Sequence, residues 1–254
     1  MLGFSVEGFL LVLARISGLF LSAPIFSSRQ MPGQIKIVAV LVLAAMMAYF
    51  LPVTTGLELA SPLYMLAAVV LEVLVGYTIG FIAYMLFAGI QLAGQLMDMQ
   101  MGFAIVNVVD PQSGMQIPLM GNLTQTVALL SYLAVNGHHY LLQAVAQSYQ
   151  IIPVLGLKLG SDFSQRLFAI SAEMFVIALK VAAPLVIAIL ITDVAMGFIA
   201  RTVPQMNVFI VGLPLKIMMG LGCLLFMFPV YLWVFDMLFT RFFGYLDGIM
   251  AFMR

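Results

Sequence analysis

Long apolar runs alternate with short polar stretches along this chain, and their lengths predict its helices. A helix that crosses a bilayer needs about 20 consecutive, mostly apolar residues. Six runs approach or exceed that length: 9–26, 37–53, 63–90, 117–135, 167–192 and 208–235. A seventh run, 140–159, is weaker because Gln143, Gln147, Gln150 and Pro153 interrupt it. It predicts an interfacial or buried helical hairpin more readily than a span.

The segment 193–216, DVAMGFIARTVPQMNVFIVGLPLK, departs most from this pattern. It is polar and carries the two cations Arg201 and Lys216 between two apolar runs. Pro204 and Pro214 lack a backbone donor and are expected to interrupt regular helix. Broken helix with charge at membrane depth is tolerated only against protein or a water-filled cavity. The predicted fold is therefore all-α, integral to a membrane or associated with one, and built of helical hairpins with broken helices.

Composition supports a membrane protein. The 254 residues are 64% hydrophobic and only 8% charged, whereas a soluble domain carries about 25% charged residues. Ten basic residues balance ten acidic ones, so no net field attracts nucleic acid. The single cysteine, Cys223, excludes an internal disulfide framework and a thiolate metal site. No cleavable signal peptide is evident, and the first apolar run is expected to remain as an anchor.

The distribution of basic residues does not predict an orientation across the membrane. In a six-span arrangement the cations of the short loops fall on both sides: Arg29, Lys36 and Arg201 on one, Lys158, Arg166, Arg241 and Arg254 on the other. The positive-inside rule requires a clear excess on one side. Either a span is miscounted, or the chain does not sit across lipid in the ordinary way.

Four charged residues lie well inside the apolar runs: Arg15, Glu72, Glu173 and Lys180. A charge at the bilayer centre costs roughly 2.5–3.5 kcal/mol on insertion scales, so each is expected to have a partner. One interpretation is an ion or proton relay in a transporter. The other, which we favour because no acidic cluster converges, is pairing between subunits inside a larger assembly. Glu72, Gly76 and Gly80 share one helical stripe whose small residues predict a packing face.

No pattern of catalytic or ligand-binding residues is present in the sequence. His138 and His139 are adjacent, whereas metal binding favours spaced ligands. A phosphate-binding glycine loop, a nucleophile elbow and paired catalytic carboxylates are all missing. We therefore expect no catalytic residue, no cofactor and no metal. The 20 Met and 20 Phe favour an interaction protein over an enzyme.

Residues 91–116, predicted as the connection between the third and fourth runs, are unusually apolar and contain no Lys or Arg. A solvated loop of this length is expected to be polar. The loop could pack on a neighbouring subunit. Alternatively it could lie in a pore and seal it, since hydrophobic constrictions gate by dewetting. Both interpretations stay open on the residues alone.

Several of these motifs together resemble the FliR/SctT family of the type III secretion export gate. The closest similarity lies in RTVPQMNVF at 201–209 and the following GLPLK at 212–216. Arg15 with APIF at 23–26, the Pro32–Gly33 turn and GQLMDMQMGFAIVNVVDPQSG at 94–114 add to it. The resemblance runs essentially from end to end, and these motifs hardly separate flagellar members from their injectisome counterparts.

The resemblance implies a non-enzymatic subunit of the flagellar export gate in the inner (cytoplasmic) membrane at the flagellar basal body. Members of the family are similar to their partners FliP and FliQ joined together, which implies a single domain over 1–254 with a FliP-like part at 1–190 and a FliQ-like part at 191–254. The implied partners are FliP, FliQ, FlhB, FlhA and unfolded flagellar substrates, with membrane lipid and no nucleic acid. Much of the apolar helix would pack on other subunits.

The resemblance also implies roles for individual residues. The central loop, 102–120, would contribute to the plug of the closed pore, and its proposed residues are Gly102, Phe103, Ile105, Val106, Asp110, Pro111 and Met115. Subunit contacts are expected at Asp193, Arg201, Pro204, Gln205, Asn207 and Lys216, with Asp193 and Lys216 pairing across an interface. The competing hypothesis is a proton-coupled secondary transporter that uses Glu72 or Glu173.

Overall fold

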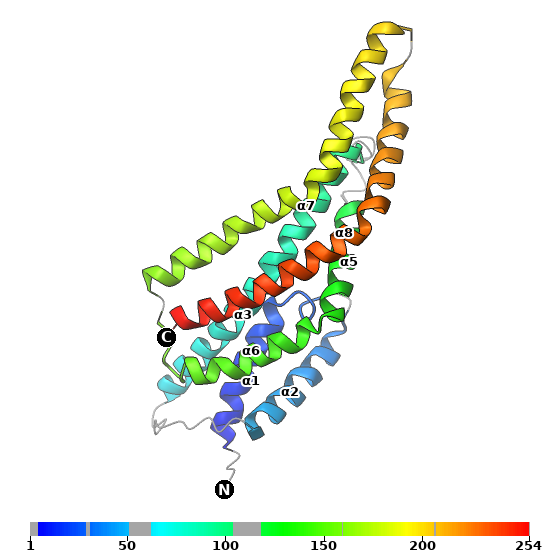
Figure 1. Cartoon of the computed structure of the whole chain (residues 1–254). Helices are drawn as coiled ribbons and strands as arrows, with labels where there is room; N and C mark the ends of the chain where they lie inside the picture. The colour runs from blue at the N-terminus through cyan, green and yellow to red at the C-terminus, as the bar shows by residue number, and fades with distance from the viewer. Residues whose placement is uncertain are drawn as a thin grey trace. The chain divides into compact units, whose positions relative to one another are not determined.

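The structure is a computed structural model that describes residues 5–28, 31–50, 62–103, 118–158, 160–205 and 207–253. Within these residues it contains helices and no strand, which confirms the all-α prediction. The helices are α1 (Val6–Ser22), α2 (Gly33–Phe50), α3 (Pro62–Met101), α5 (Leu119–Ala134), α6 (Gly137–Ile151), α7 (Ser161–Thr202) and α8 (Val208–Phe252) (Figure 1).

Fewer of the described helices have the length and apolar character of a membrane span than the sequence predicted. Four of them, α2, α3, α7 and α8, are long and apolar enough to cross a membrane. By contrast, α1 has 17 residues and α5 has 16. Helices of 17 and 16 residues lie at or just below the lower limit of about 17 residues for a membrane-spanning helix. By length and composition, four of the six predicted spans therefore qualify among the described residues, and each of the six predicted runs does form helix.

The contacts between residues divide the chain into two compact units. Unit 1 comprises Met1–Met85, Leu133–Ser171 and Phe239–Arg254, and unit 2 comprises Leu86–Tyr132 and Ala172–Leu238. Three long helices, α3, α7 and α8, contribute residues to both units. Each unit has its own buried side chains and is described separately below.

Unit 1 is organised around α1, whose side chains Leu11, Val12, Ile16 and Leu19 are fully buried. The helix begins at Ser5, whose hydroxyl accepts a hydrogen bond from the backbone nitrogen of Gly8 at 3.1 Å. It packs on α2 and on the first half of α3. A Cβ at Gly76 would collide with the Arg15 carbonyl, so the backbones of α1 and α3 touch there. The predicted packing face of α3 is confirmed.

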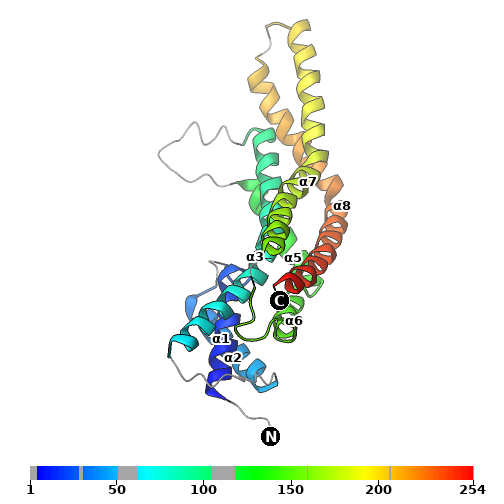
Figure 2. The same cartoon turned by 90° about the vertical axis from the view of Figure 1, so that its left-hand side faces the viewer.

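Unit 2 contains the second half of α3, together with α5 and parts of α7 and α8. A Cβ at Gly94 would lie 2.5 Å from the Cα of Gly121, so α3 and α5 are also in backbone contact. In both views α7 and α8 run side by side toward the turn that joins them (Figures 1 and 2). Helix α7 ends at Thr202 and α8 begins at Val208, and Pro204 lies between them as expected.

Two predicted interruptions of helix are wrong. Residues 91–101, predicted as loop, continue α3, because Ile90, Ala93, Met97 and Met101 recur at helical spacing and are fully buried. Pro214, predicted to break helix, lies within α8. Proline inside a membrane helix is tolerated because neighbouring groups satisfy the backbone carbonyl that it leaves without a donor.

Candidate functional site

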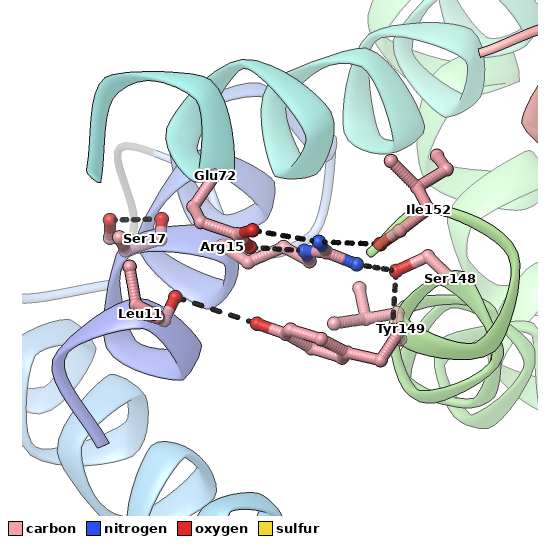
Figure 3. A network of polar contacts seen from close by, with 9 residues as sticks. Leu11, Arg15, Ser17, Glu72, Ser148, Tyr149 and Ile152 are labelled. Carbon is pink, nitrogen blue, oxygen red and sulfur yellow. Dashed lines mark hydrogen bonds and ion pairs between the residues drawn. The ribbon is translucent and has the colours of Figure 1, made fainter. Parts of the chain in front are cut away.

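A buried polar network in unit 1 surrounds Arg15, which is fully buried on α1. Its Nε donates a hydrogen bond to Oε2 of Glu72 at 2.5 Å, and Nη2 donates to Oε1 at 2.9 Å. Nη1 donates to Ser148 Oγ at 2.7 Å, and Nη2 also donates to the Ile152 carbonyl at 3.3 Å. Figure 3 shows Arg15 extending from α1 between Glu72 on α3 and the end of α6. The guanidinium thus joins three helices.

Aromatic stacking completes this network. The guanidinium carbon of Arg15 lies 3.6 Å from the centroid of the Tyr149 ring, a cation–π contact. The Tyr149 hydroxyl donates to the Leu11 carbonyl at 3.4 Å (Figure 3). Burial raises the pKa of Tyr149 above its ordinary value, while the Arg15 charge opposes this rise and Glu72 adds to it. The phenol therefore stays neutral and remains a donor at physiological pH.

The pairing of Arg15 with Glu72 corrects the interpretation that each meets another chain. Both residues were expected to find partners elsewhere in an assembly, but the partner of each is a helix of the same chain. The two lie 57 residues apart, a separation at which sequence spacing does not reveal contact. Gly76, one turn after Glu72, allows the close approach of α1 that brings them together. Because both carboxylate oxygens of Glu72 accept hydrogen bonds from Arg15, the pair holds α1 against α3.

The other two charges within the apolar runs lie on α7 in unit 2. Glu173 is half-buried and Lys180 is exposed. Elsewhere in the chain, the rings of His138 and His139 lie with their centroids 4.2 Å apart. Desolvation, and then the neighbouring charge of His139, lower the pKa of His138. In the described part of the chain, no three His, Cys, Asp or Glu side chains gather as they would around a metal.

Buried Asp98 forms a second polar site, and sequence analysis missed it. Its Oδ1 accepts a hydrogen bond from the Met120 nitrogen at 2.9 Å, and Oδ2 accepts one from the Gly121 nitrogen at 3.1 Å. The carboxylate on α3 thereby caps the first turn of α5, where unpaired donors and the helix dipole favour negative charge. Its sequence signal was an isolated acid in an apolar stretch, the only one between Glu72 and Asp110.

The proposed plug residues lie mostly outside the described part of the chain. Ile105, Val106, Asp110, Pro111 and Met115 fall within 104–117, which the structure does not describe. Gly102 and Phe103, both half-buried, follow the end of α3. Gly102 has a φ of 87°, which favours glycine, and the Phe103 nitrogen donates to the Asp98 carbonyl at 3.1 Å. Asp98 therefore links the end of α3 to the start of α5, on either side of the 104–117 segment.

The residues expected at subunit contacts lie around the turn between α7 and α8. Lys216 and Asp193 form an ion pair at 2.6 Å within the chain. They were expected to pair across a subunit interface, and the structure shows that they pair without a partner subunit. Arg201, Pro204 and Gln205 are exposed. Asn207 is also exposed. Its backbone carbonyl accepts hydrogen bonds from the Ile210 and Val211 nitrogens at the start of α8.

An apolar cleft of about 440 Å³ lies in unit 2 between α5 and α8. Leu123, Val127, Leu225 and Phe228 line it together with Tyr231. The buried Tyr231 hydroxyl has no hydrogen-bond partner among the described residues. Pro229, two residues before Tyr231 on α8, has no backbone N–H and therefore leaves one carbonyl of this helix without its helical hydrogen bond.

Comparison with known proteins places the chain in a family. Residues 6–242 match the family described as bacterial export proteins, family 1. The chain belongs to this family. It is 44% identical over 214 residues to the flagellar biosynthetic protein FliR of Bacillus subtilis, with 82% of this chain and 81% of the relative covered. The Escherichia coli protein of the same name is 28% identical over 239 residues, with 94% and 91% covered.

A more distant member extends the same picture. The flagellar biosynthetic protein FliR of Aquifex aeolicus is 27% identical over 217 residues, which cover 85% of this chain and 83% of that protein. The FliR resemblance inferred from the motifs is confirmed. Together with four described helices of membrane-spanning length, family membership makes the chain a membrane protein of bacterial export protein family 1.

Proposed function

We propose that this chain is a non-enzymatic core subunit of the flagellar type III secretion export gate. In this proposal it forms, with FliP and FliQ, the channel for unfolded flagellar proteins, and it contacts FlhB- and FlhA-like subunits in the inner membrane. The observation that carries the proposal is the family match over residues 6–242, with relatives named flagellar biosynthetic protein FliR. The division into a FliP-like part at 1–190 and a FliQ-like part at 191–254 belongs to the same proposal.

The dimensions of the long helices support an assembly of several chains. Helix α7 has 42 residues and α8 has 45. At about 1.5 Å per residue they measure about 63 and 68 Å along their paths, whereas a bilayer with its headgroups is about 40–45 Å thick. Lipid alone therefore cannot cover both helices over their full length, unless they bend into the membrane plane.

Exposed apolar side chains nonetheless continue along both helices. On α7 and α8 they include Phe168, Phe175, Leu179, Ile191, Phe198, Ile210, Met218, Leu225, Phe226 and Trp233. Exposed apolar surface of this extent marks contact with membrane or protein. Partner subunits that cover the part outside the bilayer would account for both the length and the exposure.

We further propose that residues 102–120 contribute to the plug of the closed pore. The support is the apolar character of the segment and the Asp98 contacts, which hold the start of α5 against the end of α3.

Deletion of residues 103–115 tests the plug. In the assembled channel we expect increased conductance to small ions with assembly largely intact, because the apolar seal is lost while Asp98 and α5 remain. The measurement is ion flux across vesicles that contain the isolated complex. A matched control keeps these 13 residues in scrambled order, which preserves length and apolar content. Unchanged flux after the deletion, with the complex present, would count against the plug.

The competing function, a proton-coupled transporter, receives less support from the geometry. A proton carrier must exchange protons with water, but the Glu72 side chain is 2% exposed and the Arg15 guanidinium occupies both its oxygens. Glu173 is the remaining candidate of that hypothesis. Ion-coupled movement of a solute by the reconstituted chain alone would favour the transporter.

A further inference from the structure

An apolar groove of about 860 Å³ lies in unit 1 between α1, α2 and the beginning of α3. Leu10 and Leu13 line it from α1, Val40 and Leu41 from α2, and Leu66 and Val69 from α3. Helix α2 leaves most of its surface uncovered, since only 6% of its 18 residues are buried. The groove therefore opens on a helix that faces lipid or another molecule.

The polar groups of the groove are concentrated at one end. Ser27 and Lys36 both line it: Ser27 lies in the connection between α1 and α2, and Lys36 lies in the first turn of α2. The third polar residue, Ser17, already donates its hydroxyl to the Ala14 carbonyl at 2.7 Å. Lys36 is half-buried and forms no salt bridge with any described residue. One end of the groove thus carries an uncompensated cation, and the rest is apolar.

The register of α1 and α3 fixes the direction of the groove. A Cβ at Gly76 would meet Arg15, and one at Gly80 would meet Ser22, so the two helices run parallel. Pro62, at the start of α3, therefore lines the end near Leu10, away from Lys36. From Leu10 to Leu21 the groove follows 12 residues of α1, a rise of about 16 Å at 1.5 Å per residue. One leaflet of a hydrocarbon core of roughly 30 Å is about 15 Å deep.

We propose that this groove binds an anionic phospholipid, with one acyl chain along the apolar wall and the headgroup phosphate at Lys36. A lysine in the first turn of a membrane helix extends its ammonium to the headgroup level while its stem packs on apolar surface. An anionic headgroup matches this charge better than a zwitterionic one, because its net charge is not cancelled. The inference rests on the membrane location of the chain and is independent of its role in the export gate.

The test compares two probes with identical acyl chains, phosphatidylglycerol and phosphatidylcholine, added to the full-length chain in detergent. Native mass spectrometry counts the lipids that stay bound. We expect one retained phosphatidylglycerol in preference to phosphatidylcholine. Lys36→Gln should weaken phosphatidylglycerol binding about fivefold, the value of one cation near an anionic surface, and leave phosphatidylcholine binding unchanged. Val69→Trp, which fills the groove, should reduce the binding of both lipids.

Lys158→Gln is the matched control, because it removes an exposed lysine that does not line the groove. It should bind both lipids as the unmodified chain does. The proposal would be overturned if the Lys36→Gln variant bound phosphatidylglycerol as tightly as the unmodified chain does. So would the absence of bound lipid from the chain isolated together with its partner subunits, since a protein segment would then occupy the groove. Should Val69→Trp fail to fold, the Lys36→Gln result decides alone.

Discussion

Arg15 carries a full charge at a position with no exposed surface, and its four hydrogen bonds reach α3 and α6. A buried ion pair adds little net stability compared with well-packed apolar residues, because desolvation offsets the attraction. Removing one partner is different, because it leaves the other charge buried and unpaired. The network is therefore best understood as a device that fixes which helices meet and in what register.

Replacing each partner of this pair separately and together tests that account. We expect Arg15→Met or Glu72→Met to destabilise the fold by about 3–5 kcal/mol, because each leaves buried polar groups without partners. The double variant Arg15→Met/Glu72→Met should recover much of that loss. Thermal unfolding of the detergent-solubilised protein, followed by circular dichroism, provides the measurement.

The matched control for this cycle is Arg241→Met, since Arg241 is an exposed arginine on α8. Its effect on stability should stay within about 0.5 kcal/mol, as is usual for a surface substitution. Single variants as stable as the control would show that the Arg15 network does not hold α1, α3 and α6 together. A double variant no better than the worse single one would assign the loss to packing.

At the scale of helices, direct backbone contact between α1 and α3 is the feature that determines unit 1. Gly18 and Gly80 repeat the arrangement seen at Gly76, each facing backbone or a short side chain of the other helix. Small residues at an interface let helices approach until their backbones touch, and in a membrane such packing replaces the missing hydrophobic drive. The Arg15 network depends on this approach.

Substitution of Gly76 by alanine is therefore expected to be destabilising. The new Cβ would collide with the carbonyl of Arg15, which is backbone and cannot move without shifting α1, so we expect a loss of about 1–3 kcal/mol. Gly222→Ala in α8 serves as the control, because no heavy atom lies within 4 Å of its added Cβ. That variant should gain up to about 1 kcal/mol from helix propensity. Thermal unfolding of both should shift in opposite directions, and a neutral Gly76→Ala would refute the close contact.

The apolar pattern predicted the helices well. It did not predict where α3 and α8 end, or which charged residues pair with each other. Apolar runs and the small-residue stripe on α3 are local signals, and both were sufficient. The continuation of α3 through Gly94 and Asp98 was missed, because these residues interrupt the apolar pattern. Their role is visible only in the fold, where Gly94 packs on α5 and Asp98 accepts a hydrogen bond from its first turn. The Arg15–Glu72 pair likewise depends on tertiary contact. Asp193 and Lys216 were expected to pair between chains and instead pair across their own hairpin.

At the scale of the whole molecule, exposed apolar surface along α7 and α8 is the property that requires explanation. Helices of 42 and 45 residues exceed the thickness of a bilayer, and basic residues give no orientation bias in their loops. Partner subunits that cover part of these helices explain both facts together. The exposed turn between α7 and α8 is a candidate contact point for the proposed partners.

Arg201→Ala tests the role of this turn in assembly. Arg201 is exposed near the end of α7, where its guanidinium can offer several donors to carboxylates or carbonyls of a partner. We expect less complex with FliP and FliQ to be recovered, with the stability of the chain itself unchanged. Arg241→Ala removes another exposed arginine and should leave assembly as it was. Equal recovery of both variants would remove Arg201 from the interface.

The most direct measurement of the central claim is the mass and protein content of the particle that carries this chain, extracted from its native membrane in mild detergent. If sister subunits cover its helices, the chain will leave the membrane in a large particle with FliP and FliQ, and will aggregate or be degraded when produced alone. A single-chain particle, equally stable with and without those proteins, would contradict the account.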